Sequence, residues 1–172
     1  MRKFLTVFLL LISLNLITLA EEKNTKKSPP QKLSSGEGFI IYKVEMDADE
    51  AVQILMENLK AHQLTVVDIT DPSAPLSNNI KIFPDFDKLK VSYIQNILVT
   101  SITTLYKIFT VDPNAMVLSP WVVSIYQYED DDYSYIVRTK SHLLLKGTSH
   151  PEVIKAVKEL ESRIDAAIAD LL

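Results

Sequence analysis

The 172-residue chain contains no cysteine, only three glycines and only three histidines. Without cysteine it has no disulfide, no thiol nucleophile, no covalently attached haem and no cysteine-bound metal. Its glycines, Gly36, Gly38 and Gly147, are too scattered for a phosphate-binding loop. No two histidines have the i, i+4 spacing of a helical metal site. We therefore expect no metal and no other cofactor.

Basic charge is also scarce. The chain has 18 Lys and Arg against 22 Asp and Glu, a formal net charge of −4 at neutral pH. A protein that binds nucleic acid without sequence preference neutralises phosphates with clustered Lys and Arg. The sequence shows no such stripe of basic residues, so we expect no nucleic-acid partner.

The N-terminus has the order of a secretory signal peptide. Arg2 and Lys3 precede an apolar stretch over residues 4–19, and the small residue Ala20 closes it. We expect cleavage near Ala20, a signal peptide over residues 1–20, a periplasmic or secreted bacterial protein, and no stable membrane insertion after cleavage. The alternative is an uncleaved anchor helix, because the apolar stretch is close to the shortest length that spans a bilayer.

The remainder divides into a leader and one domain. Residues 21–37 contain a single large aliphatic side chain, Leu33, among Lys, Ser, Pro and Gly. This is too little apolar surface to offset the entropy of ordering, so the sequence predicts a disordered linker. Residues 38–172 have the length and composition of one globular domain.

Hydrophobic periodicity predicts eight elements in this domain, in the order βαββαββα. Segments rich in β-branched and aromatic residues are predicted as strands: residues 39–46, 64–69, 91–99, 117–128 and 133–140. Segments with apolar residues at helical spacing are predicted as helices: residues 47–62, 100–109 and 149–171. Helices with one apolar stripe must cover a sheet, so the predicted fold is an α+β two-layer sandwich. About five mainly antiparallel strands carry the helices on one face.

Capping residues predict where the helices begin. Two capping boxes are expected, Asp47 with Glu50 and Ser149 with Glu152, and Thr100 or Ser101 is expected to cap the middle helix. Residues 71–79, DPSAPLSNN, are predicted as a loop because their prolines and Asn/Ser residues disfavour regular pairing. Glu159 and Arg163, one turn apart, are expected to support the last helix.

The predicted hairpin over residues 117–140 holds the only tryptophan and four of the seven tyrosines. Alternation places Trp121, Val123 and Ile125 on one face, with Tyr126 and Tyr128 on the other. One face must meet the helices, and the other is left half apolar. Sheet packing accounts for part of this pattern, but Tyr and Trp also suit a contact surface. The candidate binding residues are Trp121, Tyr126, Tyr128, Tyr133 and Tyr135. The occupant would be a second copy of the chain or a small apolar ligand.

Two further features are weighed for chemistry. Asp130, Asp131 and Asp132 could hold a hard cation, but the spacing and glycine of a calcium loop are missing, so a solvated hairpin tip without tight calcium binding is predicted. His142 is the histidine considered for proton transfer. Its neighbour Ser141 would point to the opposite face of a strand, which argues against a nucleophile and base pair. The other two histidines are expected at helix ends.

The element order and the segment VDPNAMVLSPWVVSIYQYEDDDYSYIV, residues 111–137, resemble the family catalogued as Domain of Unknown Function 302. The resemblance covers residues 39–172, and its most specific part runs from Leu118-Ser119-Pro120-Trp121 to Tyr126-Gln127-Tyr128-Glu129. It implies a compact two-layer α/β fold, often paired as a dimer, with no agreed activity. Members tend to have Asn-Pro where this chain has Thr100-Ser101, and some have Cys where it has Trp121. Thiol chemistry is therefore absent here.

These observations favour an exported, non-enzymatic module that binds a ligand or associates with itself. The alternative is a small hydrolase-like or isomerase-like enzyme built on Asp, His142 and backbone donors. A third hypothesis is a structural role in the cell envelope, with an uncleaved anchor holding the domain near the membrane.

Overall fold

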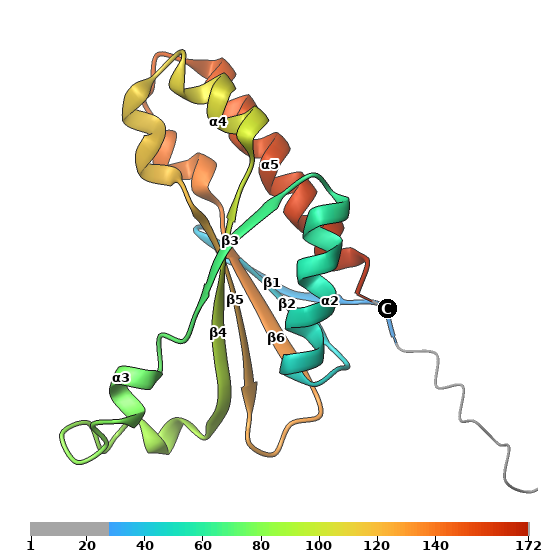
Figure 1. Ribbon diagram of the computed structural model, residues 1–172, viewed down its shortest axis with the longest axis vertical. Helices are drawn as coiled ribbons and strands as arrows, with labels where there is room; N and C mark the ends of the chain where they lie inside the picture. Colours follow the sequence, from blue (N-terminus) through green and yellow to red (C-terminus); the bar gives the residue numbers. More distant parts are fainter. Residues whose placement is uncertain (1–27, 172) are drawn as a thin grey trace, which may run out of the picture.

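The computed structural model describes residues 28–171 as six antiparallel strands in one open sheet (Figure 1). The strand order is β1-β2-β6-β5-β4-β3. The strands are β1 (Gln31–Ser35), β2 (Phe39–Val44), β3 (Thr65–Thr70), β4 (Val91–Thr100), β5 (Trp121–Tyr128) and β6 (Ser134–Thr139). The predicted signal peptide and the first part of the predicted linker lie outside the described residues.

The helices form the second layer of the sandwich. They are α2 (Ala48–Ala61), α3 (Ala74–Ser77), α4 (Ile102–Phe109) and α5 (Pro151–Ala169), with 3-10 turns η1 (Asp87–Leu89), η2 (Pro113–Leu118) and η3 (Ser141–Leu145). Helices α2 and α5 pack against each other on one side of the sheet, and α4 packs on α5 beyond the end of the sheet (Figure 1). The predicted α+β sandwich with helices on one face is confirmed, with six strands where about five were expected. No helix of the described part is both long and apolar enough to cross a membrane.

The core lies between the sheet and the two long helices. Alternate residues of β4, β5 and β6 face the core from the sheet, and the apolar stripes of α2 and α5 face it from the helix layer. The largest fully buried side chains are Leu55, Leu59, Ile97, Ile108, Ile125, Ile136, Leu160, Ile164, Ile168 and Leu171. Each contributes about 1.5–3 kcal/mol by leaving water, so a domain without disulfides has a core large enough to hold it together.

Strand β1 corrects the predicted linker over residues 21–37. Residues 31–35 pair with β2 in antiparallel register, with a bulge between Lys32 and Ser34. The polar side chains of this segment gave no strand signal, but backbone groups on the open edge of β2 supply the pairing. Lys140 Nζ also donates to the Gly36 carbonyl oxygen at 2.8 Å, which ties the β1–β2 turn to the end of β6.

One strand boundary and one additional helix also differ from the sequence pattern. The fourth predicted strand was expected from residue 117, but residues 113–118 form η2, and β5 begins only at Trp121. Asp112 starts this turn, because its Oδ1 accepts from the Asn114 amide at 3.0 Å. A short α3 also lies within the predicted loop of residues 71–79, where Asp71 Oδ1 accepts from the Ser73 amide at 2.8 Å.

The beginnings of the helices follow the predictions in part. Ser101 caps α4, because its Oγ accepts from the Thr104 amide at 3.4 Å. Asp47 precedes α2 but makes no side-chain cap bond. Gln127 of β5 takes that place, because its Oε1 accepts from the Ala48 amide at 2.9 Å. The cap of α5 is His150 rather than Ser149, and its side chain makes no cap bond.

Glu159 and Arg163 support α5 by joining it to α4. Lys107 Nζ of α4 donates to Glu159 Oε2 at 3.0 Å. Arg163 Nη2 donates to Ser101 Oγ at 3.0 Å and to Thr104 Oγ1 at 2.9 Å. The two side chains therefore hold neighbouring helices together and do not act mainly on each other.

Candidate functional site

The side of the sheet away from the helices is uncovered and largely uncharged. Figure 1 shows α2 and α5 on one side and no helix of the described chain over the other. The half-buried residues of β4, β5 and β6 on this open face are Ile94, Asn96, Leu98, Val122, Ser124, Tyr126, Tyr135 and Val137, and Tyr128 is exposed. An antiparallel sheet that faces water usually carries polar side chains there, so this face is more apolar than a solvated sheet face usually is.

Three tyrosines form a cluster at the hairpin end of the open face. The rings of Tyr126 and Tyr135 stack with centroids 5.1 Å apart and planes 14° apart. The ring of Tyr128 meets both edge-on, at 5.5 Å from Tyr126 and 5.7 Å from Tyr135. Tyr126 and Tyr135 are direct partners in the β5–β6 register, so the hairpin itself sets the stack. The structure brings these three candidate residues together, and their role in binding stays a prediction.

Tyr133 joins the same face through a neighbouring lysine. Lys43 Nζ of β2 lies 3.6 Å from the centroid of the Tyr133 ring, a cation–π contact. The two side chains line a cavity of about 380 Å³ with Gln31 and Glu45, beside the entry to β1. The open face therefore ends in a small hollow at its β2 margin.

Asp131 of the acidic run holds the hairpin turn. Its Oδ2 accepts from the Tyr135 hydroxyl at 2.6 Å, and its Oδ1 accepts from the Tyr133 amide at 3.2 Å. The bond to Asp131, together with burial, raises the pKa of Tyr135 to about 12. Among residues 28–171, no group of three or more His, Cys, Asp or Glu side chains is arranged to hold a metal ion.

Trp121 lies apart from the tyrosines. It is on the helix-covered side of β5 with 3% of its surface exposed, and its Nε1 has no hydrogen-bond partner. The structure thus brings Tyr126, Tyr128, Tyr133 and Tyr135 together and leaves Trp121 in the core. The alternation along β5 already implied this separation, since Trp121 is five residues from Tyr126.

A second site lies under α5, where charged side chains are buried. Arg138 of β6 is 5% exposed and donates to both carboxylate oxygens of Asp165. Its Nη1 also lies 3.4 Å from Oε2 of the buried Glu161. Tyr42 of β2 donates to Asp165 Oδ1 at 2.8 Å, and burial together with this bond raises the pKa of Tyr42 to about 12. The cluster joins α5 to β2 and β6.

His142 completes this cluster at its outer end. The His142 amide donates to Glu161 Oε1 at 2.9 Å, and its ring Nδ1 lies 2.7 Å from Glu161 Oε2. A carboxylate on Nδ1 fixes the orientation of the imidazole and leaves Nε2 as the nitrogen for another partner. The neighbouring Ser141 Oγ instead contacts Thr139 Oγ1 at 2.9 Å. The sequence placed Ser141 and His142 on a strand, but they lie in the 3-10 turn η3, where their side chains have different partners.

A sequence profile of the family described as "Domain of unknown function DUF302" matches residues 40–171 of the chain. The chain belongs to this family. No curated protein sequence matches it. The fold is similar to the crystal structure of an uncharacterised conserved DUF302 protein from Bacillus stearothermophilus, with a TM-score of 0.65 and 15% identity over 80% of this chain and 100% of that one.

In this DUF302 domain the sequence analysis missed Arg138, Glu161, Asp165 and Tyr42. A signal for them was present. Arg138 alternates with Ser134 and Ile136, and so falls on the core face of β6. Glu161 and Asp165 are one helical turn apart beside the apolar stripe of α5. A basic residue on a core face needs acidic partners, and this pair is placed to supply them.

The other two histidines of the DUF302 domain lie at helix ends, as expected. His62 follows α2, and its Nε2 lies 2.7 Å from Asp170 Oδ2 at the end of α5. His150 precedes α5, and its Nδ1 lies 3.6 Å from Glu152 Oε1. Both positions connect or terminate helices, which is a structural role.

Proposed function

We propose that the protein is an exported module that acts by binding, and that the occupant of its open face is a second copy of the chain. The observation that carries this proposal is the uncharged, half-apolar side of β4, β5 and β6, with the tyrosine cluster at one end. Tyrosine suits such a surface, because it buries a large area and still donates a hydrogen bond.

The size of the open face supports a dimer. β4, β5 and β6 supply the uncharged centre, and with β1, β2 and β3 at its margins six strands spaced about 4.8 Å apart, with β5 about 26 Å long, give a flat area of at most roughly 600 Å². A standard interface buries about 800 Å² on each partner, and the relief of the side chains raises the accessible area above the flat value. A two-fold axis through the face would place identical patches against each other.

The lack of charge supports a copy of the same surface as the partner. The β4, β5 and β6 residues of the open face carry no Asp, Glu, Lys or Arg. The centres of two identical faces can therefore meet without like charges opposing each other, while Lys43 of β2 and Asp68 of β3 lie at the margins. A face with a net charge would instead favour a partner of opposite sign.

Sedimentation of the exported chain tests the proposal. The wild type is expected to show a concentration-dependent dimer. Val122→Asp or Val137→Asp places an unpaired carboxylate within the interface, so each is expected to raise the dissociation constant at least about tenfold. Val117→Asp is the matched control, because Val117 is 84% exposed and lies in η2, away from the face.

A strict monomer at all accessible concentrations contradicts the proposal. So does a dimer that survives both carboxylate substitutions while circular dichroism shows an unchanged fold. A small apolar molecule that copurifies with a monomer and contacts the tyrosine cluster would identify a ligand as the occupant instead.

Export is part of the proposal and rests on the order of residues 1–20. Mass spectrometry of the protein recovered from outside the cytoplasm is expected to find Glu21 as the first residue. A chain that begins at Met1 and stays in the membrane fraction would support the uncleaved anchor and the structural envelope role.

A second candidate function is a small hydrolase-like or isomerase-like enzyme, which the Glu161–His142 pair favours. A carboxylate that orients an imidazole is the usual support of a general base. The test measures turnover of a panel of ester substrates and a panel of isomerase substrates. The wild type is compared with His142→Ala and Glu161→Gln. Turnover that is lost in His142→Ala and reduced in Glu161→Gln would support catalysis by this pair. If the wild type turns over no substrate of either panel, the enzyme hypothesis is rejected.

A further inference from the structure

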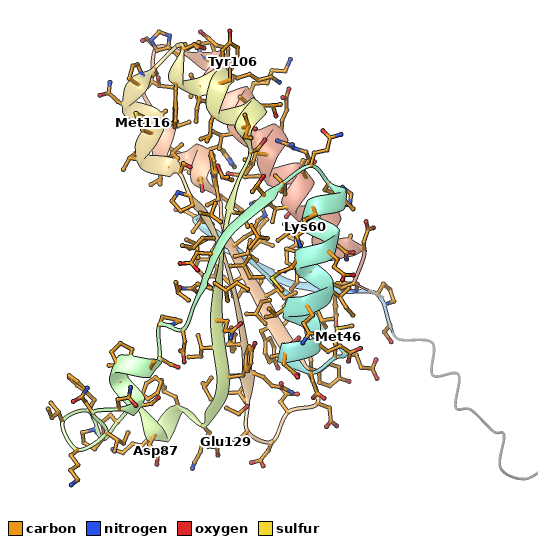
Figure 2. The ribbon with its side chains drawn as sticks, in the orientation of Figure 1. Met46, Lys60, Asp87, Tyr106, Met116 and Glu129 are labelled. Carbon is orange, nitrogen blue, oxygen red and sulfur yellow. The ribbon has the colours of Figure 1, made fainter. Side chains whose placement is uncertain are left out.

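The four most exposed large apolar side chains of the described chain are on α4, η2 and η3, elements at one end of the molecule (Figure 1). They are Ile102 at 77%, Tyr106 at 73%, Val117 at 84% and Leu144 at 76% exposure. Met116, at 55%, is on the same end, and Figure 2 labels it with Tyr106 there. We call these five residues the α4 end. Soluble domains seldom gather such side chains without a partner.

Lysines accompany the apolar side chains of the α4 end. A hollow of about 380 Å³ between α4 and α5 is lined by Tyr106, Lys107 and Lys155, with Glu152 and Glu159 on its wall. Lys158 lies one turn further along α5, beside Lys155 and Ile154 in an adjoining hollow. Apolar residues and lysines therefore share one surface.

The charge of this region differs from that of the rest of the domain. Segments 102–118 and 141–159, which include α4, η2, η3 and the first half of α5, carry Lys107, Lys146, Lys155 and Lys158 against Asp112, Glu152 and Glu159. This is a slight positive balance, and Lys107 is bonded to Glu159. The remainder of residues 28–171 has 9 basic and 17 acidic side chains. An anionic surface is therefore repelled by most of the molecule and accepted at the α4 end.

We propose that the α4 end docks on a bilayer surface that carries anionic headgroups. The apolar side chains stand on three short elements at one end of the molecule, where they would enter the headgroup boundary, and Tyr106 suits that boundary. The lysines would then lie at the level of the phosphates. This docking is independent of the proposed dimer, because the open face lies on the other layer of the sandwich.

The absence of cysteine allows a local test on the full chain. An environment-sensitive nitrobenzoxadiazole label is attached at Val117→Cys or Leu144→Cys, and at Val67→Cys and Ile82→Cys as controls. The control positions are also exposed, at 58% and 69%, but lie in β3 and the β3–β4 connection. The label reports only whether its own position enters a bilayer, so attachment through residues 1–20 does not interfere.

With phosphatidylglycerol vesicles, the emission at positions 117 and 144 is expected to rise and shift to the blue, while positions 67 and 82 stay unchanged. Phosphatidylcholine vesicles are expected to give a much smaller response. In the labelled chain, Lys155→Glu with Lys158→Glu is expected to weaken binding to phosphatidylglycerol by about tenfold. Val122→Asp on the open face is expected to leave the response unchanged.

Three results would overturn the docking. Labels at 117 and 144 that do not respond to vesicles exclude it. An equal response to both lipids removes the role of the lysines. A blue shift without vesicles that grows with protein concentration shows that the α4 end contacts another protein copy instead.

Discussion

Tyr126 and Tyr135 stack across β5 and β6, and the hydroxyl of Tyr135 reaches Asp131 in the turn between those strands at 2.6 Å. One residue thus joins the open face to the hairpin tip. The acidic run at residues 130–132 is explained in part by this bond, because Asp131 shapes the turn that brings the two strands into register.

Tyr135→Phe keeps the stacked ring and removes the bond to Asp131. We expect a loss of about 1 kcal/mol in the free energy of unfolding, the usual net value of a hydrogen bond. Tyr133→Phe is the matched control, since its ring contact with Lys43 does not use the hydroxyl, and it should stay within about 0.5 kcal/mol of wild type. Urea unfolding measures both. Equal losses in the two variants would mean that the Asp131 bond contributes nothing specific.

High pH should destabilise the domain through Tyr42 and Tyr135. The pKa of each is raised to about 12 in the folded state, against about 10 in an unfolded chain. The folded state therefore keeps these protons after the unfolded state has lost them. Stability is complete below about pH 10 and falls as the pH rises towards about 12. Urea unfolding across this range, with tyrosinate absorbance, measures the effect. If all seven tyrosines titrate together near their ordinary pKa, the raised pKa values of Tyr42 and Tyr135 are contradicted.

The buried cluster under α5 should depend strongly on Arg138. Arg138→Ala leaves Glu161 buried without its cation and Asp165 without its bidentate partner, so we expect a loss of about 3 kcal/mol or more. Arg163→Ala on α5 removes bonds to two hydroxyls and to the exposed Gln63 carbonyl oxygen, and should cost about 1 kcal/mol.

Urea unfolding compares the two arginine variants, and Arg138→Lys provides a milder change if Arg138→Ala does not fold. Lysine keeps the charge but cannot form the planar pair with Asp165, so an intermediate loss is expected. A stability for Arg138→Ala close to that of Arg163→Ala would show that the cluster contributes little.

Gln127 should matter more than Asp47 for the start of α2. The Gln127 amide accepts from the Ala48 amide and donates to the Asp131 carbonyl oxygen at 2.8 Å, so it joins the helix to the hairpin. Gln127→Ala is expected to lower the free energy of unfolding by about 1–2 kcal/mol. Asp47→Ala should cost less, because Asp47 makes no cap bond. Thermal unfolding measures the loss of stability in both variants. A larger loss in Asp47→Ala than in Gln127→Ala would support the capping box that the sequence predicted.

Local patterns predicted most of the fold because they are strong here. The apolar stripe of α5 and the alternation along β5 each determine which side chains meet the core, and the structure agrees with both. Strand β1 could not be predicted this way, since its pairing comes from the open edge of β2 and not from its own side chains. The same holds for the cap of α2, which Gln127 provides from a strand far along the chain.

The candidate site was predictable to a similar degree. Alternation placed Tyr126 and Tyr128 opposite Trp121, and the hairpin brought Tyr133 and Tyr135 beside them. The buried cluster was not predicted, because Arg138 meets Glu161 and Asp165 only when α5 lies over β6. Contacts between distant segments depend on the packed fold, whereas faces of single elements can be read from spacing.

The central claim, that a second copy covers the open face, is tested most directly at Ser124. Ser124→Cys is nearly isosteric, lies in the middle of the face, and supplies the only thiol in the chain. Its rate of reaction with a bulky maleimide is expected to fall as the protein concentration rises, while Val117→Cys reacts at a constant rate. A rate at Ser124→Cys that does not change with concentration, in a protein that stays folded, would contradict the account.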